Sequence, residues 1–174
     1  MICAIITILF GACAFVMLTQ PALAFYGGGE GELANEIKDF LNKFLGDNTS
    51  GYGLLTFEEG QNTFHLVGNI FIIIAMVFCG LMILFSIINL IMTAAGKDKV
   101  IGTRVFAMLF FVFALIALIM YVLYANQLMS TTIEDFIQTI KDGGVVFTVG
   151  YGLICFAAAA LLSIFFASGR KKKK

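Results

Sequence analysis

Long uncharged runs alternate with short polar segments along this chain. Three of the runs, residues 66–95, 105–124 and 145–167, contain no Asp, Glu, Lys or Arg. Each is long enough to cross a membrane as a helix, which takes about 20 mainly apolar residues. Tyr121 and Tyr124 are placed like the aromatic residues that mark a membrane interface. The pattern predicts an all-α integral membrane protein with three transmembrane helices.

A fourth apolar run, at the start of the chain, predicts a cleavable secretory signal peptide over residues 1–24. The run is broken by Thr19, Gln20 and Pro21. Ala22-Leu23-Ala24 then supplies small residues at the two positions that signal peptidase inspects, so cleavage is expected between Ala24 and Phe25. No Lys or Arg precedes the apolar run, which leaves an uncleaved first helix as the alternative.

The polar segments 25–65 and 125–144 each predict a short amphipathic helix on the outer face of the membrane. In the first, apolar residues recur at helical spacing over 32–45, and Gly46 can end the helix. In the second, over 131–142, Thr131 and Glu134 fit a capping box. Such short helices are marginal alone in water, so we expect them to lie on the membrane surface or against a partner.

Composition excludes a soluble domain and leaves no candidate for catalysis. Of the 174 residues, 60% are hydrophobic and 13% are charged, whereas about a quarter of a typical soluble domain is charged. His65, the one histidine, has no cysteine or acid at metal-ligand spacing, and we interpret it as an interfacial residue. The four cysteines lie in apolar runs, so no disulfide framework is expected. We expect no enzyme, no metal site and no cofactor.

The charged residues predict the orientation in the membrane. The loop 96–104 and the tail 168–174 carry eight basic residues and one acid, Asp98, whereas the segments 25–65 and 125–144 carry ten acids and three lysines. The positive-inside rule therefore places the loop and the C-terminal tail in the cytoplasm and the mature N-terminus in the periplasm. The basic topology anchors are Lys97, Lys99, Arg104, Arg170, Lys171, Lys172, Lys173 and Lys174.

A face of small residues on the third predicted span indicates close helix packing. From Thr148 onward these residues are three or four positions apart, and the candidates are Gly152, Cys155, Ala159, Ser163 and Ala167. Small side chains let helices approach closely in lipid, either within one chain or between subunits. Asn89 is a candidate for a hydrogen bond between helices. The spans contain no ionisable residue, which disfavours ion transport through this chain alone.

The order of a signal peptide, Gly27-Gly28-Gly29, a long apolar span, the basic turn Gly96-Lys97-Asp98-Lys99 and a second span resembles the conjugative pilin family and related small inner-membrane components of type IV secretion systems. The resemblance covers residues 22–124 and concerns architecture. The third span and the lysine tail depart from a pilin. The resemblance implies a non-enzymatic subunit of a secretion or conjugation machine in the bacterial inner membrane.

Two other functions stay open, a holin-like pore former and an accessory subunit of a larger membrane complex. A eukaryotic origin also stays open, because the terminal lysines resemble a dilysine retrieval signal and Asn48-Thr49-Ser50 fits a glycosylation site. In each case the expected partners are the lipid bilayer and other membrane subunits, including further copies of this chain. The basic tail lacks the interleaved aromatic residues of a nucleic-acid patch, so no specific nucleic-acid binding is expected.

Overall fold

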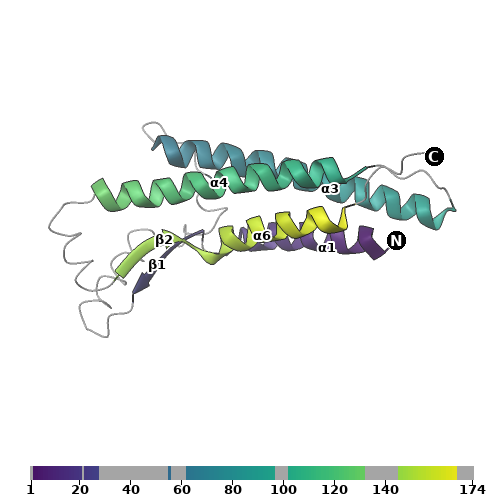
Figure 1. The fold of residues 1–174 in the computed structure, drawn as a ribbon, viewed down its shortest axis with the longest axis horizontal. Helices are drawn as coiled ribbons and strands as arrows, with labels where there is room; N and C mark the ends of the chain where they lie inside the picture. Colours follow the sequence, from purple (N-terminus) through teal and green to yellow (C-terminus); the bar gives the residue numbers. More distant parts are fainter. Residues whose placement is uncertain are drawn as a thin grey trace.

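The structure is a computed structural model that describes residues 2–20, 22–27, 55, 62–96, 102–131 and 145–167. Within these residues the chain forms four helices and a two-stranded antiparallel ribbon (Figure 1). The helices are α1 (Ile2–Met17), α3 (Thr63–Ala94), α4 (Arg104–Thr131) and α6 (Tyr151–Phe166). The strands are β1 (Leu23–Gly27) and β2 (Val145–Val149).

The two long helices, α3 and α4, lie antiparallel along one another and share the most extensive contact in the bundle (Figure 1). The buried residues of α4 are three or four positions apart: Ala107, Phe110, Ala114, Ala117, Tyr121 and Ala125. A spacing near 3.5 residues keeps one seam of a helix facing its neighbour. Stacked rings join the helices along this seam, with 5.4 Å between the centroids of Phe78 and Phe113 and 5.0 Å between those of Phe85 and Phe106.

The two short helices, α1 and α6, lie along each other and continue into the ribbon (Figure 1). β1 pairs with β2 from Leu23 opposite Val149 to Gly27 opposite Val145. α1 also contacts α3, and α6 contacts α4, so the four helices form one bundle. The first and last helices of the described chain are therefore direct neighbours.

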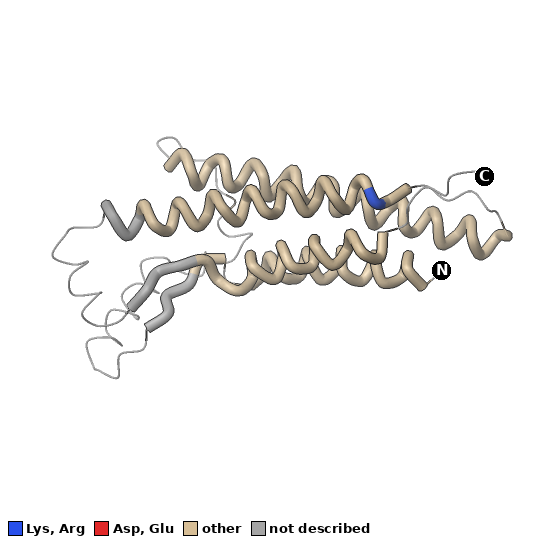
Figure 2. Tube along the Cα trace, in the orientation of Figure 1, with Lys and Arg blue, Asp and Glu red and all other residues tan. Residues whose placement is uncertain are grey.

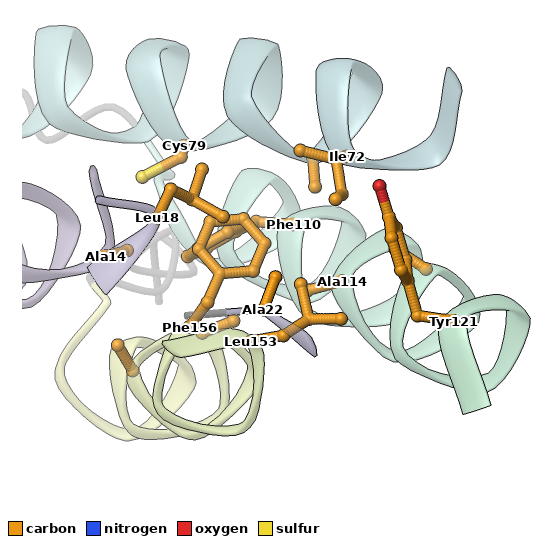
Figure 3. Packing of buried hydrophobic residues seen from close by; sticks show 14 of the residues in the cluster. Ala14, Leu18, Ala22, Ile72, Cys79, Phe110, Ala114, Tyr121, Leu153 and Phe156 are labelled. Atoms are coloured by element: carbon orange, nitrogen blue, oxygen red, sulfur yellow. The ribbon is translucent and has the colours of Figure 1, made fainter. Parts of the chain in front are cut away.

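The centre of the bundle is filled by large side chains between small ones. Phe110 of α4 and Phe156 of α6 meet edge to face, with 5.3 Å between the ring centroids (Figure 3). Leu18 and Leu153 are fully buried beside them. Small buried residues surround these four side chains, among them Ala14, Ala22, Ala114 and Cys79.

The outside of the bundle is apolar, which suits a membrane. Isoleucine, leucine and valine side chains are exposed along all four helices, whereas many alanines are buried between them. Arg104 is the only charged residue in the part of the chain that the structure describes (Figure 2). α3 and α4 are each long and apolar enough to cross a membrane. The prediction of a helical protein with apolar spanning helices is thus confirmed for these two helices.

One boundary of the predicted spans needs correction. α3 covers the span predicted over 66–95 almost residue for residue, but α4 continues past residue 124 as far as Thr131. No glycine or proline interrupts the chain between Tyr124 and Thr131, so nothing stops the helix there. Thr131 is therefore the last residue of α4 instead of the cap of a new helix. The predicted amphipathic helices, 32–45 and the rest of 131–142, lie outside the described residues.

The span predicted over 145–167 divides into β2 and α6, so a third spanning helix is not shown. β2 is rich in β-branched residues, which favour strands, and Gly144 and Gly150 border it. The pairing with β1 supplies the hydrogen bonds that an isolated strand would lack. The 16 residues of α6 extend about 24 Å, less than the hydrocarbon core of about 30 Å.

A signal peptide is likewise not shown. α1 occupies the predicted leader, and the expected cleavage point between Ala24 and Phe25 falls within β1. Ala24 pairs with Thr148, and Phe25 pairs with Phe147. In the structure, the predicted leader is one of the packed helices, and cleavage stays a prediction.

Candidate functional site

The candidate site is a group of four polar and aromatic side chains between α3 and α4. His65 and Asn69 lie one turn apart near the start of α3 and are 6% and 0% exposed. Tyr121 and Tyr124 lie three residues apart on α4, with Tyr121 fully buried and Tyr124 partly buried. Residues three or four positions apart share a helix face, so the antiparallel arrangement brings the two pairs together. We call these four residues the polar cluster.

Each member of the polar cluster contacts another. The Tyr121 hydroxyl donates a hydrogen bond to Asn69 Oδ1. The His65 ring stacks on Tyr124 with 4.7 Å between centroids and 7° between ring planes, and it meets Tyr121 edge to face at 5.8 Å. Gly68 makes room for the Tyr121 ring, because a Cβ at residue 68 would lie 2.9 Å from Tyr121 Cε2. Tyr121 therefore contacts α3 through both its hydroxyl group and its ring.

A second polar contact joins the same helices about one turn nearer to the start of α3 and the end of α4. Asn62 Oδ1 accepts a hydrogen bond from the Phe64 backbone N–H at 2.9 Å and so caps the start of α3. The Asn62 side-chain amide donates to Gln127 Oε1 at 3.0 Å. One amide side chain thus both caps α3 and ties it to α4.

The chemistry of this site is that of helix association. In lipid, a hydrogen bond between helices is worth about 0.5 to 2 kcal/mol, and an aromatic pair contributes about 0.5 to 1.5 kcal/mol. No group of three metal-ligating His, Cys, Asp or Glu side chains occurs among the residues that the structure describes. The polar cluster and the Asn62–Gln127 bond therefore hold one end of the α3–α4 hairpin together.

The residues predicted for helix packing on α6 lie mostly in its contact with α1 and α4. Gly152, Ala159, Ser163 and Ala167 are buried, and Cys155 is partly buried. A Cβ at Gly152 would lie 2.7 Å from the carbonyl oxygen of Gln20, so a glycine is needed there. Ser163 Oγ donates to the Ala159 carbonyl at 2.8 Å within α6. Thr148 belongs to β2 and therefore does not continue this helical face.

The other predicted residues are spread over the chain. Asn89 is buried near the end of α3, and its backbone carbonyl accepts a hydrogen bond from Thr93 Oγ1 at 2.8 Å. Arg104 is exposed at the first turn of α4. The remaining topology anchors lie outside the described residues: Lys97, Lys99, Arg170, Lys171, Lys172, Lys173 and Lys174.

Sequence reasoning missed the polar cluster because it treated each member by itself. His65 is interpreted from the sequence as an interfacial residue at the edge of the first span, and Tyr121 and Tyr124 as markers of an interface end of the second span, without pairing them. The register of an antiparallel hairpin connects them, since Asn62 meets Gln127 and His65 meets Tyr124, two pairs with the same sum of residue numbers. A search for polar residues at matching distances from the loop between two spans would have found the site.

Comparison of the chain with protein-family models, curated proteins and solved structures finds no match.

Proposed function

We propose that this protein is a non-enzymatic subunit of a secretion or conjugation machine of the type IV kind, embedded in the bacterial inner membrane. The order of its apolar and basic segments supports this function. The same proposal places the basic loop 96–104 and the C-terminal tail in the cytoplasm, on the strength of the charge distribution.

The observation that carries the proposal is that polar side chains in the described bundle connect its helices with one another. The polar cluster connects α3 with α4, and the Tyr151 hydroxyl, which donates to Gln20 Oε1 at 2.7 Å, connects α6 with the turn after α1. The exterior consists of large apolar side chains, and Arg104 is the one charged residue described. Such a molecule offers surfaces for lipid and for other helices, which is the chemistry of a structural subunit.

The filled interior favours a structural subunit over a holin-like pore formed by one copy. Phe110, Phe156, Leu18 and Leu153 occupy the place where the four helices meet (Figure 3). A water-filled channel needs polar groups along its wall, and this part of the wall is apolar. Purified protein added to liposomes loaded with a fluorescent dye should therefore release no more dye than detergent-matched buffer.

The test of the proposal is the identity of the partners. The chain carrying a C-terminal affinity tag is expressed from its own promoter, extracted in mild detergent and purified, and the associated proteins are identified by mass spectrometry. Membrane subunits of an envelope secretion or conjugation system should co-purify at constant stoichiometry. An unrelated inner-membrane protein with the same tag is the control. Recovery of the chain alone, or with respiratory or transport subunits, would contradict the proposal.

A further inference from the structure

We infer that α1 remains in the mature protein as a permanent helix of the bundle, and that the segment 1–24 is not discarded as a leader. The inference depends on the contacts of α1 and of the turn after it with α6, β2 and α3. It does not depend on the proposed function, because a retained helix is compatible with any of the functions considered.

The contact between the end of α1 and the start of α6 is backbone against backbone. A Cβ on Gly152 would lie 2.8 Å from the Met17 carbonyl oxygen and 2.7 Å from that of Gln20. Nearby, the Gly150 backbone N–H donates to the Ala22 carbonyl at 2.7 Å. Only glycine allows two backbones to approach so closely. The start of α6 is therefore shaped to fit the segment that cleavage would remove.

The ribbon ties the same segment to the rest of the chain. Cleavage between Ala24 and Phe25 would divide β1 in its middle and take away Leu23, which is buried opposite Val149. A two-stranded ribbon is at best marginally stable in water by itself. The three residues of β1 that remained would no longer be joined to α1, whereas β2 would keep its contact with α4.

α1 is also fitted to α3 and to the far end of α6. The Cys79 thiol donates to the Gly11 carbonyl oxygen with 3.6 Å between sulfur and oxygen. A Cβ on Gly11 would lie 2.6 Å from Ile83 Cγ1, so the Ile83 side chain would have to shift if residue 11 were larger than glycine. Phe10 stacks on Phe166 with 5.6 Å between the ring centroids. α1 is thus in contact with the bundle along most of its length.

Retention of α1 changes the topology. α1 begins and α6 ends at the same end of the bundle, which is also the end where α4 begins (Figure 1). With α1 retained, the bundle keeps all four of its described helices, of which α3 and α4 are long and apolar enough to cross a membrane. The start of α1 then lies on the same side as the loop 96–104, whereas a cleaved chain would begin on the opposite side.

The first test is the intact mass of the wild-type protein after extraction from membranes in mild detergent. The expected mass includes residues 2–24. A monodisperse chain that begins at Phe25 and keeps the helix content of the remaining helices would overturn the inference. This result would leave the partners of the protein unaffected, so it is separate from the test of the proposed function.

The second test is a disulfide between β1 and β2 that can form only if residues 1–24 are retained. The Gly150–Ala22 hydrogen bond marks residues 22 and 150 as a hydrogen-bonded pair, so Leu23 and Val149 form the next, non-hydrogen-bonded pair. The Cα atoms of such a pair lie about 4.5 Å apart, within the range of a disulfide. Leu23→Cys with Val149→Cys is made in a background without the four native cysteines. Ala22 and Ala24, which the peptidase inspects, are unchanged.

Peptide mass spectrometry should find the disulfide between residues 23 and 149 in most of the oxidised membrane protein. The matched control is Leu23→Cys with Ile154→Cys, because Ile154 lies on the exposed side of α6 and should give no disulfide. A 23–149 yield no higher than that of the control, in protein whose mass begins at Phe25, would overturn the inference. If the double variant fails to accumulate, the intact mass of the wild-type chain alone decides whether α1 is retained.

Discussion

At the scale of single residues, the α3–α4 hairpin places polar groups inside and large apolar groups outside. His65, Asn69 and Tyr121 are buried, whereas Val77 and Leu115 are exposed. In water this arrangement would be unfavourable, but in lipid the exposed apolar side chains contact hydrocarbon and the polar groups pair between helices. The polar cluster therefore stabilises the hairpin in the environment where the hydrophobic effect no longer drives helices together.

Replacement of Tyr121 by Phe should lower the stability of the hairpin. The change removes the hydroxyl that donates to buried Asn69 and keeps the ring that packs on Gly68 and His65. We expect a loss of about 0.5 to 2 kcal/mol, the usual value of a hydrogen bond between membrane helices. Thermal unfolding followed by circular dichroism in mild detergent measures this loss.

Tyr151→Phe is the matched control for this experiment. It also removes a hydroxyl that donates to a side-chain amide, but the bond to Gln20 is exposed. A bond of this kind competes with water, so the expected loss is small. Equal midpoints for Tyr121→Phe and the wild type would show that the hydrogen bond between Tyr121 and Asn69 contributes nothing to stability.

At the scale of elements, the sequence predicts those helices and strands that are determined by residues close together in the chain. The bounds of α3 follow from one uninterrupted apolar run, and Gly96 follows its last turn with a positive φ of 71°. β1 and β2 could not be predicted in this way, because they lie at opposite ends of the chain and become strands by pairing with each other. An apolar run that ends near Pro21 also fits a signal peptide and a packed helix equally well. The choice between them depends on contacts that distant residues supply.

The close crossing of α1 and α6 should not tolerate a methyl group. Gly152→Ala places a Cβ within 3 Å of the backbone of Met17 and Gln20, and backbone atoms cannot move aside as a flexible side chain can. We expect a lower unfolding midpoint and easier proteolysis of the segment between α1 and β1. Limited proteolysis in detergent, read by mass spectrometry, measures the second effect.

The control for this substitution is Gly80→Ala, in the interior of α3. A Cβ at residue 80 would meet no atom within 4 Å, and alanine favours a helix over glycine by about 1 kcal/mol. Gly80→Ala should therefore be neutral or stabilising. If both variants behave alike, the close approach at Gly152 does not matter for stability.

The small residues further along α6 lead to a related prediction. Ala159→Leu or Ser163→Leu should reduce recovery of folded protein, because each adds a large side chain at a buried position. Leu162→Ala is the control, since Leu162 is exposed on the other side of the helix. All three substitutions introduce an apolar residue, so targeting to the membrane and insertion should not change. Size-exclusion profiles and native gels after mild extraction measure recovery.

Wild-type behaviour of both leucine variants would mean that this side of α6 accepts bulk and that its burial is not needed for assembly.

At the scale of the whole molecule, the order of the charged residues along the sequence predicts two membrane sides of opposite charge. Eight of the eleven basic residues follow α3 or α6, whereas ten of the eleven acidic residues precede α3 or follow α4. An additional membrane helix at the start of the chain leaves these loops on their sides, so the orientation argument is the same for three helices and for four. What changes is the side on which the chain begins.

Cysteine labelling should show both the orientation and the fate of α1. In a background without native cysteines, single cysteines are placed at Asn48, Gln138, Asp98 or Ile2. A membrane-impermeant thiol reagent should label residues 48 and 138 in intact spheroplasts, because the acidic segments are expected outside. Residue 98, in the basic loop, should be labelled only after permeabilisation.

Ile2→Cys separates the two topologies. Ile2 is exposed at the start of α1. If α1 is retained, this cysteine lies on the side of Asp98 and is labelled only after permeabilisation. If the segment 1–24 is removed, the purified protein carries no label under either condition, while the cysteine at residue 48 is labelled as before. Labelling of residue 98 in intact spheroplasts, together with protection of residues 48 and 138, would reverse the orientation and contradict the assignment of the lysine-rich tail to the cytoplasm.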